Sequence, residues 1–197
     1  MNNMIFTREY PKPDINYKEI CKYYGALHTN KEVKAIIDNC ISESENSFTY
    51  KVCFGLFPLE IVDENIDLGF TRFYSKNLAV NLSECKKVII FSATVGVEID
   101  RLIARYTRIS PAKSLCFQAI GTERIEALCD IFCKDLKTEY GFTKTRFSPG
   151  YGDLSLDCQK DIFRTLDCER KIGLTLTDSL LMIPSKSVTA FVGLKKG

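Results

Sequence analysis

The sequence predicts an α+β (mixed α/β) fold in which helices flank a largely antiparallel central sheet. Three observations support this class. Residues 111–140 form one helical stretch, which begins with the favourable pair Ser110-Pro111 and stops before Gly141. Residues 88–93 are apolar enough for a strand in the interior of a sheet. Further β-type runs gather in residues 48–68 and 174–194.

The N-terminal third is expected to hold an arm, two helices and a β-rich segment. Residues 1–14 are polar and include two prolines, which favours an extended arm. Helices are expected over residues 17–24 and 31–43, and apolar side chains in the second recur at helical spacing. Glycine and proline punctuate the β-rich segment that follows, and residues 75–85 are expected to be helical again.

The C-terminal half is expected to combine helices with short strands. A helix is expected over residues 97–106, and the long helix after it carries one apolar stripe that would face the core. A strand is expected over residues 142–147, followed by a turn. The remaining expected elements are helices over 156–166 and 168–172 and strands over 174–177, 180–183 and 188–194.

Composition and charge exclude several classes of protein. The chain has 197 residues, 45% of them hydrophobic and 26% charged, which fits one globular domain. Its formal net charge is +2, without a dense basic run, so no nucleic-acid partner is expected. The longest uncharged stretch, residues 88–97, is half of the roughly 20 residues that cross a bilayer. We therefore expect no membrane association and, since the N-terminus lacks the pattern of a signal peptide, a cytoplasmic location.

Cysteine and histidine usage argues against a metal site in this chain. The nine cysteines include no Cys-x-x-Cys pair, and a disulfide framework is unusual in a reducing compartment. We expect them to be small buried hydrophobes or surface thiols. The single histidine, His28, is expected in a loop, and it lacks the Asp-x-His-x-x-Gly context that would ligate cobalt.

The segment from Arg146 to Asp153 carries the clearest chemical signal. Pro149 and Gly150 suit the central positions of a type II turn, where glycine supplies the positive φ. Gly150 and Gly152 also leave room for a ligand to approach the backbone. The guanidinium of Arg146 could bind a carboxylate through two parallel hydrogen bonds. From these residues alone, a tight strand-to-helix turn beside a surface arginine is an equally good interpretation.

The stretch Arg146-Phe-Ser-Pro-Gly-Tyr151 resembles the Arg-x-x-x-Gly-Tyr motif of the activation domain of cobalamin-dependent methionine synthase. The similarity continues through residues 167–179 and 183–188. Residues 93–101 and 125–130 resemble the free-standing relatives of that domain. Together these ordered blocks are far more specific than one short motif, and they imply the fold of that activation domain.

The resemblance also implies a ligand and its binding residues. Members of the family bind S-adenosylmethionine while the cobalt of the synthase is oxidised. An electron, usually from flavodoxin, then precedes transfer of the methyl group to cobalt. In this sequence Arg146 would bind the carboxylate of the ligand and Glu126 would accept from its ammonium group. Backbone groups of Ser148 and Gly150 would line the ligand, and Tyr151 would lie beside it near the docked corrin.

Glu126 also has a structural interpretation, because Glu123, Glu126 and Asp130 recur at helical spacing and would equally form a solvated acidic face. The chain departs from the family pattern in three places. It has no clear counterpart of an acidic ligand residue near the N-terminal end of the synthase domain. The later tyrosines of that domain and the cysteine-rich tail of many free-standing relatives are not found before Gly197. A more open pocket is therefore expected.

The expected organisation is an arm over residues 1–14 and one activation-domain-like domain over residues 15–197. In that domain, residues 15–74 would form a helical and β-hairpin part and residues 75–197 the S-adenosylmethionine-binding core. Three functions stay open. The chain could be an accessory methyltransferase component that reactivates a methionine synthase in trans, with cobalamin held by that partner. It could instead bind S-adenosylmethionine for another corrinoid protein without methyl transfer, or keep the fold without the ligand.

Overall fold

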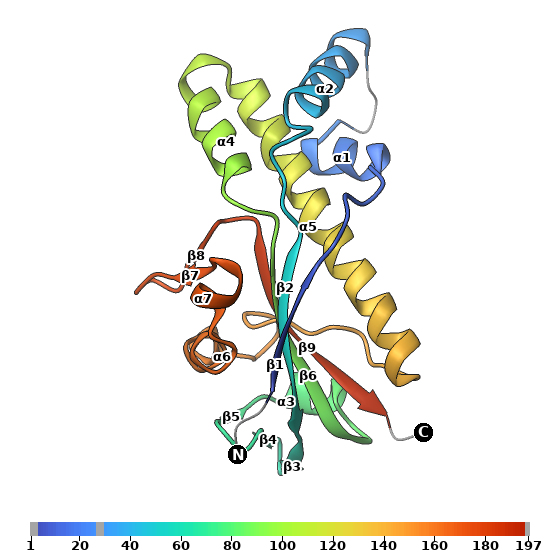
Figure 1. Cartoon of the computed structure of the whole chain (residues 1–197), viewed down its shortest axis with the longest axis vertical. Helices are drawn as coiled ribbons and strands as arrows, with labels where there is room; N and C mark the ends of the chain where they lie inside the picture. The colour runs from blue at the N-terminus through green and yellow to red at the C-terminus, as the bar shows by residue number, and fades with distance from the viewer. Residues whose placement is uncertain (1–3, 27–29, 196–197) are drawn as a thin grey trace.

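The computed structural model describes residues 4–26 and 30–195, and a four-stranded sheet forms its centre (Figure 1). The strand order is β1-β2-β6-β9, and every neighbouring pair is antiparallel. The predicted fold class, an α+β fold with helices around a largely antiparallel sheet, is therefore confirmed. The four strands are β1 (Ile5–Glu9), β2 (Lys51–Pro58), β6 (Cys85–Thr94) and β9 (Ser187–Lys195).

Four helices pack over one face of this sheet. The longest, α5, runs along much of the molecule, and the other three gather around its N-terminal half (Figure 1). Apolar side chains of α5, among them Leu128, Phe132 and Leu136, pack against sheet residues such as Phe54 and Phe91. The helices are α1 (Tyr17–Tyr24), α2 (Lys31–Glu43), α4 (Glu98–Ile109) and α5 (Pro111–Tyr140).

The opposite face is covered by shorter elements, which form a second core. Leu78, Ile162 and Ile172, one from each of three short helices, pack there against Val88 and Ile90. The elements on this side are α3 (Lys76–Asn81), α6 (Cys158–Leu166) and α7 (Cys168–Ile172), the small antiparallel sheet of β3 (Glu60–Val62), β4 (Asn65–Asp67) and β5 (Arg72–Tyr74), and the hairpin of β7 (Thr175–Leu176) and β8 (Met182–Ile183).

Strand β6 separates the two cores, and this explains its continuous apolar sequence. Ile89 and Phe91 face the core below α5, whereas Val88 and Ile90 face the core below α3, α6 and α7. Successive side chains of a strand point to opposite faces, so a strand that is buried on both faces needs apolar residues at successive positions. The predicted interior strand is confirmed.

The helices predicted over residues 17–24, 31–43 and 111–140 are confirmed residue for residue. The strand predicted over residues 142–147 is wrong, because only Thr143 and Phe147 form isolated bridges to β9. Thr143 pairs with Leu194, and Phe147 pairs with Phe191. The two bridges are therefore four residues apart in this segment but only three residues apart in β9. One extra residue interrupts the ladder of hydrogen bonds, as in a β-bulge, and frees the intervening side chains from strict alternation.

Other differences are smaller. Residues 5–9, which were expected in an extended arm, form the edge strand β1, and the helix expected over residues 75–85 ends at Asn81. The boundaries proposed at residues 14 and 74 stay a prediction. All nine cysteines are unpaired, seven of them buried, and His28 lies outside the described residues. Within the described ranges, no helix is both long and apolar enough to span a bilayer.

Candidate functional site

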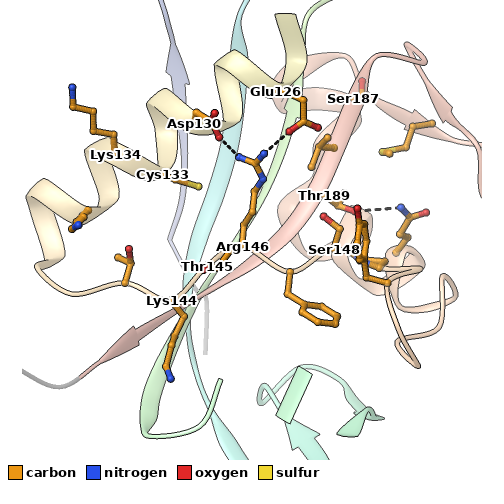
Figure 2. Close-up of a pocket in the computed structure, with 18 residues that line it drawn as sticks. Glu126, Asp130, Cys133, Lys134, Lys144, Thr145, Arg146, Ser148, Ser187 and Thr189 are labelled. Carbon is orange, nitrogen blue, oxygen red and sulfur yellow. Dashed lines mark hydrogen bonds and ion pairs between the residues drawn. The ribbon is translucent and has the colours of Figure 1, made fainter. Parts of the chain in front are cut away.

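A cavity of about 780 Å³ opens between α5, residues 143–151, α6 and β9, and is called the site cavity here (Figure 2). Its wall includes Glu126 and Asp130 of α5, Arg146 and Tyr151 of the connecting segment, and Gln159 of α6. These residues come from segments far apart in the sequence, which the two-sided packing of the sheet brings together. The volume lies within the range that is usual for small-molecule sites.

Arg146 is held in place by its neighbours in the chain. The amide of Phe147 donates to the carbonyl of Phe191 at 2.9 Å, and the amide of Phe191 donates back to Phe147 at 2.8 Å. The amide of Lys144 donates to the carbonyl of Gly193 at 2.8 Å. The backbone around Arg146 is thus attached to β9 on both sides, while the interrupted pairing lets its side chain point towards α5 (Figure 2).

The guanidinium of Arg146 binds two carboxylates on α5. Nη1 donates to Asp130 at 2.6 Å, and Nη2 donates to Glu126 (Figure 2). Residues 126 and 130 are four positions apart on the helix, so both side chains lie on one face. The side chain of Arg146 is 24% exposed, that of Glu126 is 40% exposed, and that of Asp130 is 73% exposed. Asp130 is therefore the partner that is more easily displaced.

Burial and neighbouring charges determine the protonation states of Arg146 and of the two cysteines beside it. Burial by itself would lower the pKa of Arg146, but the carboxylates of Asp130 and Glu126 raise it above its ordinary value. Burial also raises the pKa of Cys129 and that of Cys133. Both thiols therefore stay protonated near neutral pH, and they are poor nucleophiles and poor metal ligands.

The turn after Arg146 forms as predicted. The amide of Tyr151 donates to the carbonyl of Ser148 at 3.2 Å, and Gly150 has a φ of 86°, as a type II turn requires at its third position. The amide of Gly150 donates to the carbonyl of Leu154 at 2.9 Å. This amide is therefore engaged within the turn. The ring of Tyr151 is 71% exposed and makes an edge contact with Phe147.

Asp153 attaches this turn to the beginning of α3. Its carboxylate accepts hydrogen bonds from the hydroxyl of Ser75 at 2.6 Å, the amide of Lys76 at 2.8 Å and the amide of Asn77 at 3.2 Å. The hydrogen bond from Ser75 is the largest cause of a lowered pKa for Asp153. At Gly152, which has a φ of 56°, a β-carbon would lie 2.1 Å from the side-chain nitrogen of Asn77, so a larger residue would displace that side chain.

Four of the five residues predicted for the site line the cavity: Glu126, Arg146, Ser148 and Tyr151. Gly150 is not among the lining residues, and it shapes the turn instead. The alternative of a solvated acidic face on α5 does not describe Glu123, which is 3% exposed and paired with Arg124.

Among the wall residues that sequence reasoning did not assign to the site, three matter most for its chemistry: Asp130, Gln159 and Thr189. Asp130 had a usable signal, because it stands four positions after Glu126. Gln159 and Thr189 had none, because a single glutamine in a helix and a single threonine in a strand are ordinary residues there. Both are buried, and both line the cavity.

Comparison with known proteins agrees with this fold. A family model described as "Vitamin B12 dependent methionine synthase, activation domain" matches residues 79–196, more than half of the chain. A crystal structure of the MetH reactivation domain bound to AdoHcy aligns with a TM-score of 0.72 at 15% sequence identity. That alignment covers 97% of this chain and 78% of the other chain, and it shows a shared fold.

The antiparallel sheet and the long helix across it define an α+β domain with the fold of that reactivation domain. More specifically, the chain belongs to the family of vitamin B12-dependent methionine synthase activation domains.

Proposed function

We propose that this chain binds S-adenosylmethionine in the site cavity and supports the reductive methylation of cobalamin in a methionine synthase that acts as its partner. Membership of the activation-domain family supports the corrinoid partner. The observation that carries the choice of ligand is Arg146, a rigidly held guanidinium whose two nitrogens face acidic side chains in a cavity of suitable size. A bidentate guanidinium matches the carboxylate of an amino acid.

The ion pairs around Arg146 suggest how the amino-acid end would bind. Arg146 would release both Asp130, the more exposed partner, and Glu126, and would bind the carboxylate of the ligand through Nη1 and Nη2. Glu126 would then be free to accept a hydrogen bond from the ammonium group. Arg146 and Glu126 would thereby neutralise the carboxylate and the ammonium group of the ligand, one for one.

The reaction would be shared between two proteins. The partner would hold cobalamin, and a flavodoxin-like donor would supply the electron that reduces cob(II)alamin to cob(I)alamin. The methyl group of the sulfonium would then pass to cobalt, leaving S-adenosylhomocysteine in the cavity. The contribution of this chain would be to hold the methyl donor in a fixed orientation towards the partner. A cytoplasmic location belongs to this proposal.

Two measurements test this function. Calorimetric titration with S-adenosylmethionine and S-adenosylhomocysteine should give saturable binding of each. A synthase that lacks its own activation domain should then acquire labelled methyl groups on cobalamin when this chain, labelled S-adenosylmethionine and reduced flavodoxin are supplied. Binding without transfer would favour a module that serves another corrinoid protein. Absence of binding, confirmed by a second method, would contradict the choice of ligand.

Asp130 offers a sharper test of the exchange at Arg146. Asp130→Asn should strengthen binding of S-adenosylmethionine about threefold, because it removes an exposed ion pair that competes with the ligand and is worth less than about 1 kcal/mol. The matched control is Glu32→Gln, which removes one negative charge on α2 outside the cavity. Titration calorimetry at low and high salt measures both. Weaker binding by Asp130→Asn would mean that Asp130, like Glu126, binds the ammonium group.

A further inference from the structure

The site cavity has a second polar end, away from the ion pairs of Arg146. It is formed by Gln159 of α6 and Thr189 of β9, which are 3% and 2% exposed. The side chain of Gln159 donates through Nε2 to Oγ1 of Thr189 at 3.2 Å, the dashed line beside the Thr189 label in Figure 2. Figure 2 draws Thr189, Ser148 and Glu126 to the right of Arg146, and it draws Asp130 to the left. The end around Thr189 contains uncharged hydrogen-bonding groups.

The amide of Gln159 has an unused group. Its Oε1 is shielded from solvent and has no hydrogen-bond partner among the described residues. Turning the amide over would pair Oε1 with Thr189 and leave Nε2 with unused donors, so one side of the amide stays unpaired in either orientation. Buried polar groups are nearly always paired, and each exception requires an explanation.

The position of Gln159 supplies that explanation. Of the four buried side-chain oxygens without a partner in the described residues, three belong to Tyr17, Tyr50 and Asn81, which do not line the site cavity. Gln159 does line it, and its hydrogen bond to Thr189 occupies one side of the amide. An unpaired buried group costs stability in the free protein. That stability is recovered when a bound ligand supplies the missing hydrogen-bond partner.

We infer that Gln159 binds the adenosyl group of the ligand, its shielded amide turning towards the cavity so that Oε1 accepts a hydrogen bond from a donor of that group. This inference rests on the proposed function, because the charged end of the cavity would hold the amino-acid part. S-adenosylmethionine likewise has a charged end and an uncharged end. Two kinds of donor are present in its adenosyl group: the amino group of adenine and the hydroxyl groups of ribose. Gln159 would thereby distinguish the ligand from free methionine, which fills the charged end alone.

The experiment compares ligands that lack one donor each. S-adenosylhomocysteine, its inosyl analogue and its 2′-deoxy and 3′-deoxy analogues are titrated into wild type, Gln159→Met and Gln159→Glu. Gln118→Met is the matched control, since Gln118 lies on α5 outside the cavity. Thermal unfolding of each variant establishes that it is folded. Gln159→Glu keeps a hydrogen-bond acceptor at this position. It therefore shows whether a loss of binding by Gln159→Met comes from the missing acceptor or from misfolding.

Wild type should bind one analogue about tenfold more weakly than S-adenosylhomocysteine, the size expected for one buried hydrogen bond. Gln159→Met should bind S-adenosylhomocysteine about tenfold more weakly and should no longer discriminate against that analogue. A lost preference for adenine over hypoxanthine identifies the base as the donor, and a lost preference for a hydroxyl identifies the ribose. Gln118→Met should behave as wild type.

A Gln159→Met variant that is folded and weakens all ligands equally, with unchanged preferences, would overturn this inference and leave a structural role. In that case the proposed function would stand, since the wild type would still bind S-adenosylhomocysteine. If the wild type bound none of these ligands, the proposed function would fail and the role of Gln159 would fail with it.

Discussion

Arg146→Ala is expected to weaken the binding of S-adenosylmethionine at least about 100-fold, the largest effect on binding that we predict. Arg146 would make two charge-assisted hydrogen bonds to the carboxylate of the ligand, and their loss costs on the order of 3 kcal/mol. The variant also leaves Glu126 and Asp130 without their shared cation, so two carboxylates on one helix face would repel each other. Titration calorimetry measures the change.

Two further variants show which property of Arg146 matters. Arg146→Lys keeps the positive charge but loses the planar fork, and it should bind about tenfold more weakly than the wild type. Arg164→Ala is the matched control, because Arg164 is an exposed arginine of α6 that pairs with Asp161 and does not line the cavity. Arg146→Ala that binds within about threefold of the wild type would refute the assignment of the carboxylate site.

Arg124→Met is expected to cause the largest loss of stability, about 3–5 kcal/mol in the free energy of unfolding. The side chain of Arg124 is 1% exposed and donates two hydrogen bonds to Glu123, each of 2.5 Å. It also donates to the carbonyls of Pro13 at 2.6 Å and Asp14 at 2.7 Å. The variant would leave the buried carboxylate of Glu123 without its counter-charge and release residues 13 and 14 from α5.

Urea unfolding of a matched set tests this prediction. Arg101→Met removes an exposed arginine that pairs with Glu98 on α4, and it should cost less than about 1 kcal/mol. The double variant Arg124→Met with Glu123→Leu removes both buried charges and should recover much of the stability lost by the single variant. A loss below about 1 kcal/mol for Arg124→Met would mean that this buried pair contributes little.

The sequence by itself determined several helices, the interior strand and the most informative turn. Helix ends are encoded locally, so Pro111 at the first position and Gly141 after the last delimit α5 without reference to the rest of the fold. The turn at Pro149-Gly150 is likewise local, because a positive φ selects glycine. Residues 88–93 indicated an interior strand because burial on both faces demands an unbroken apolar run. The resemblance around Arg146 then identified the family.

The tertiary structure decided what depends on residues distant in the sequence. Periodicity treats Glu123, Glu126 and Asp130 as equivalent, but Glu123 is buried against Arg124, whereas the other two bind Arg146 at the cavity. The interrupted pairing before Arg146 depends on the register of β9, which no local signal specifies. Gln159 is an ordinary helix residue until α6 packs beside Thr189 and leaves its carbonyl oxygen unpaired. Local signals fix where helices and turns form, but burial and pairing partners arise only when distant segments pack together.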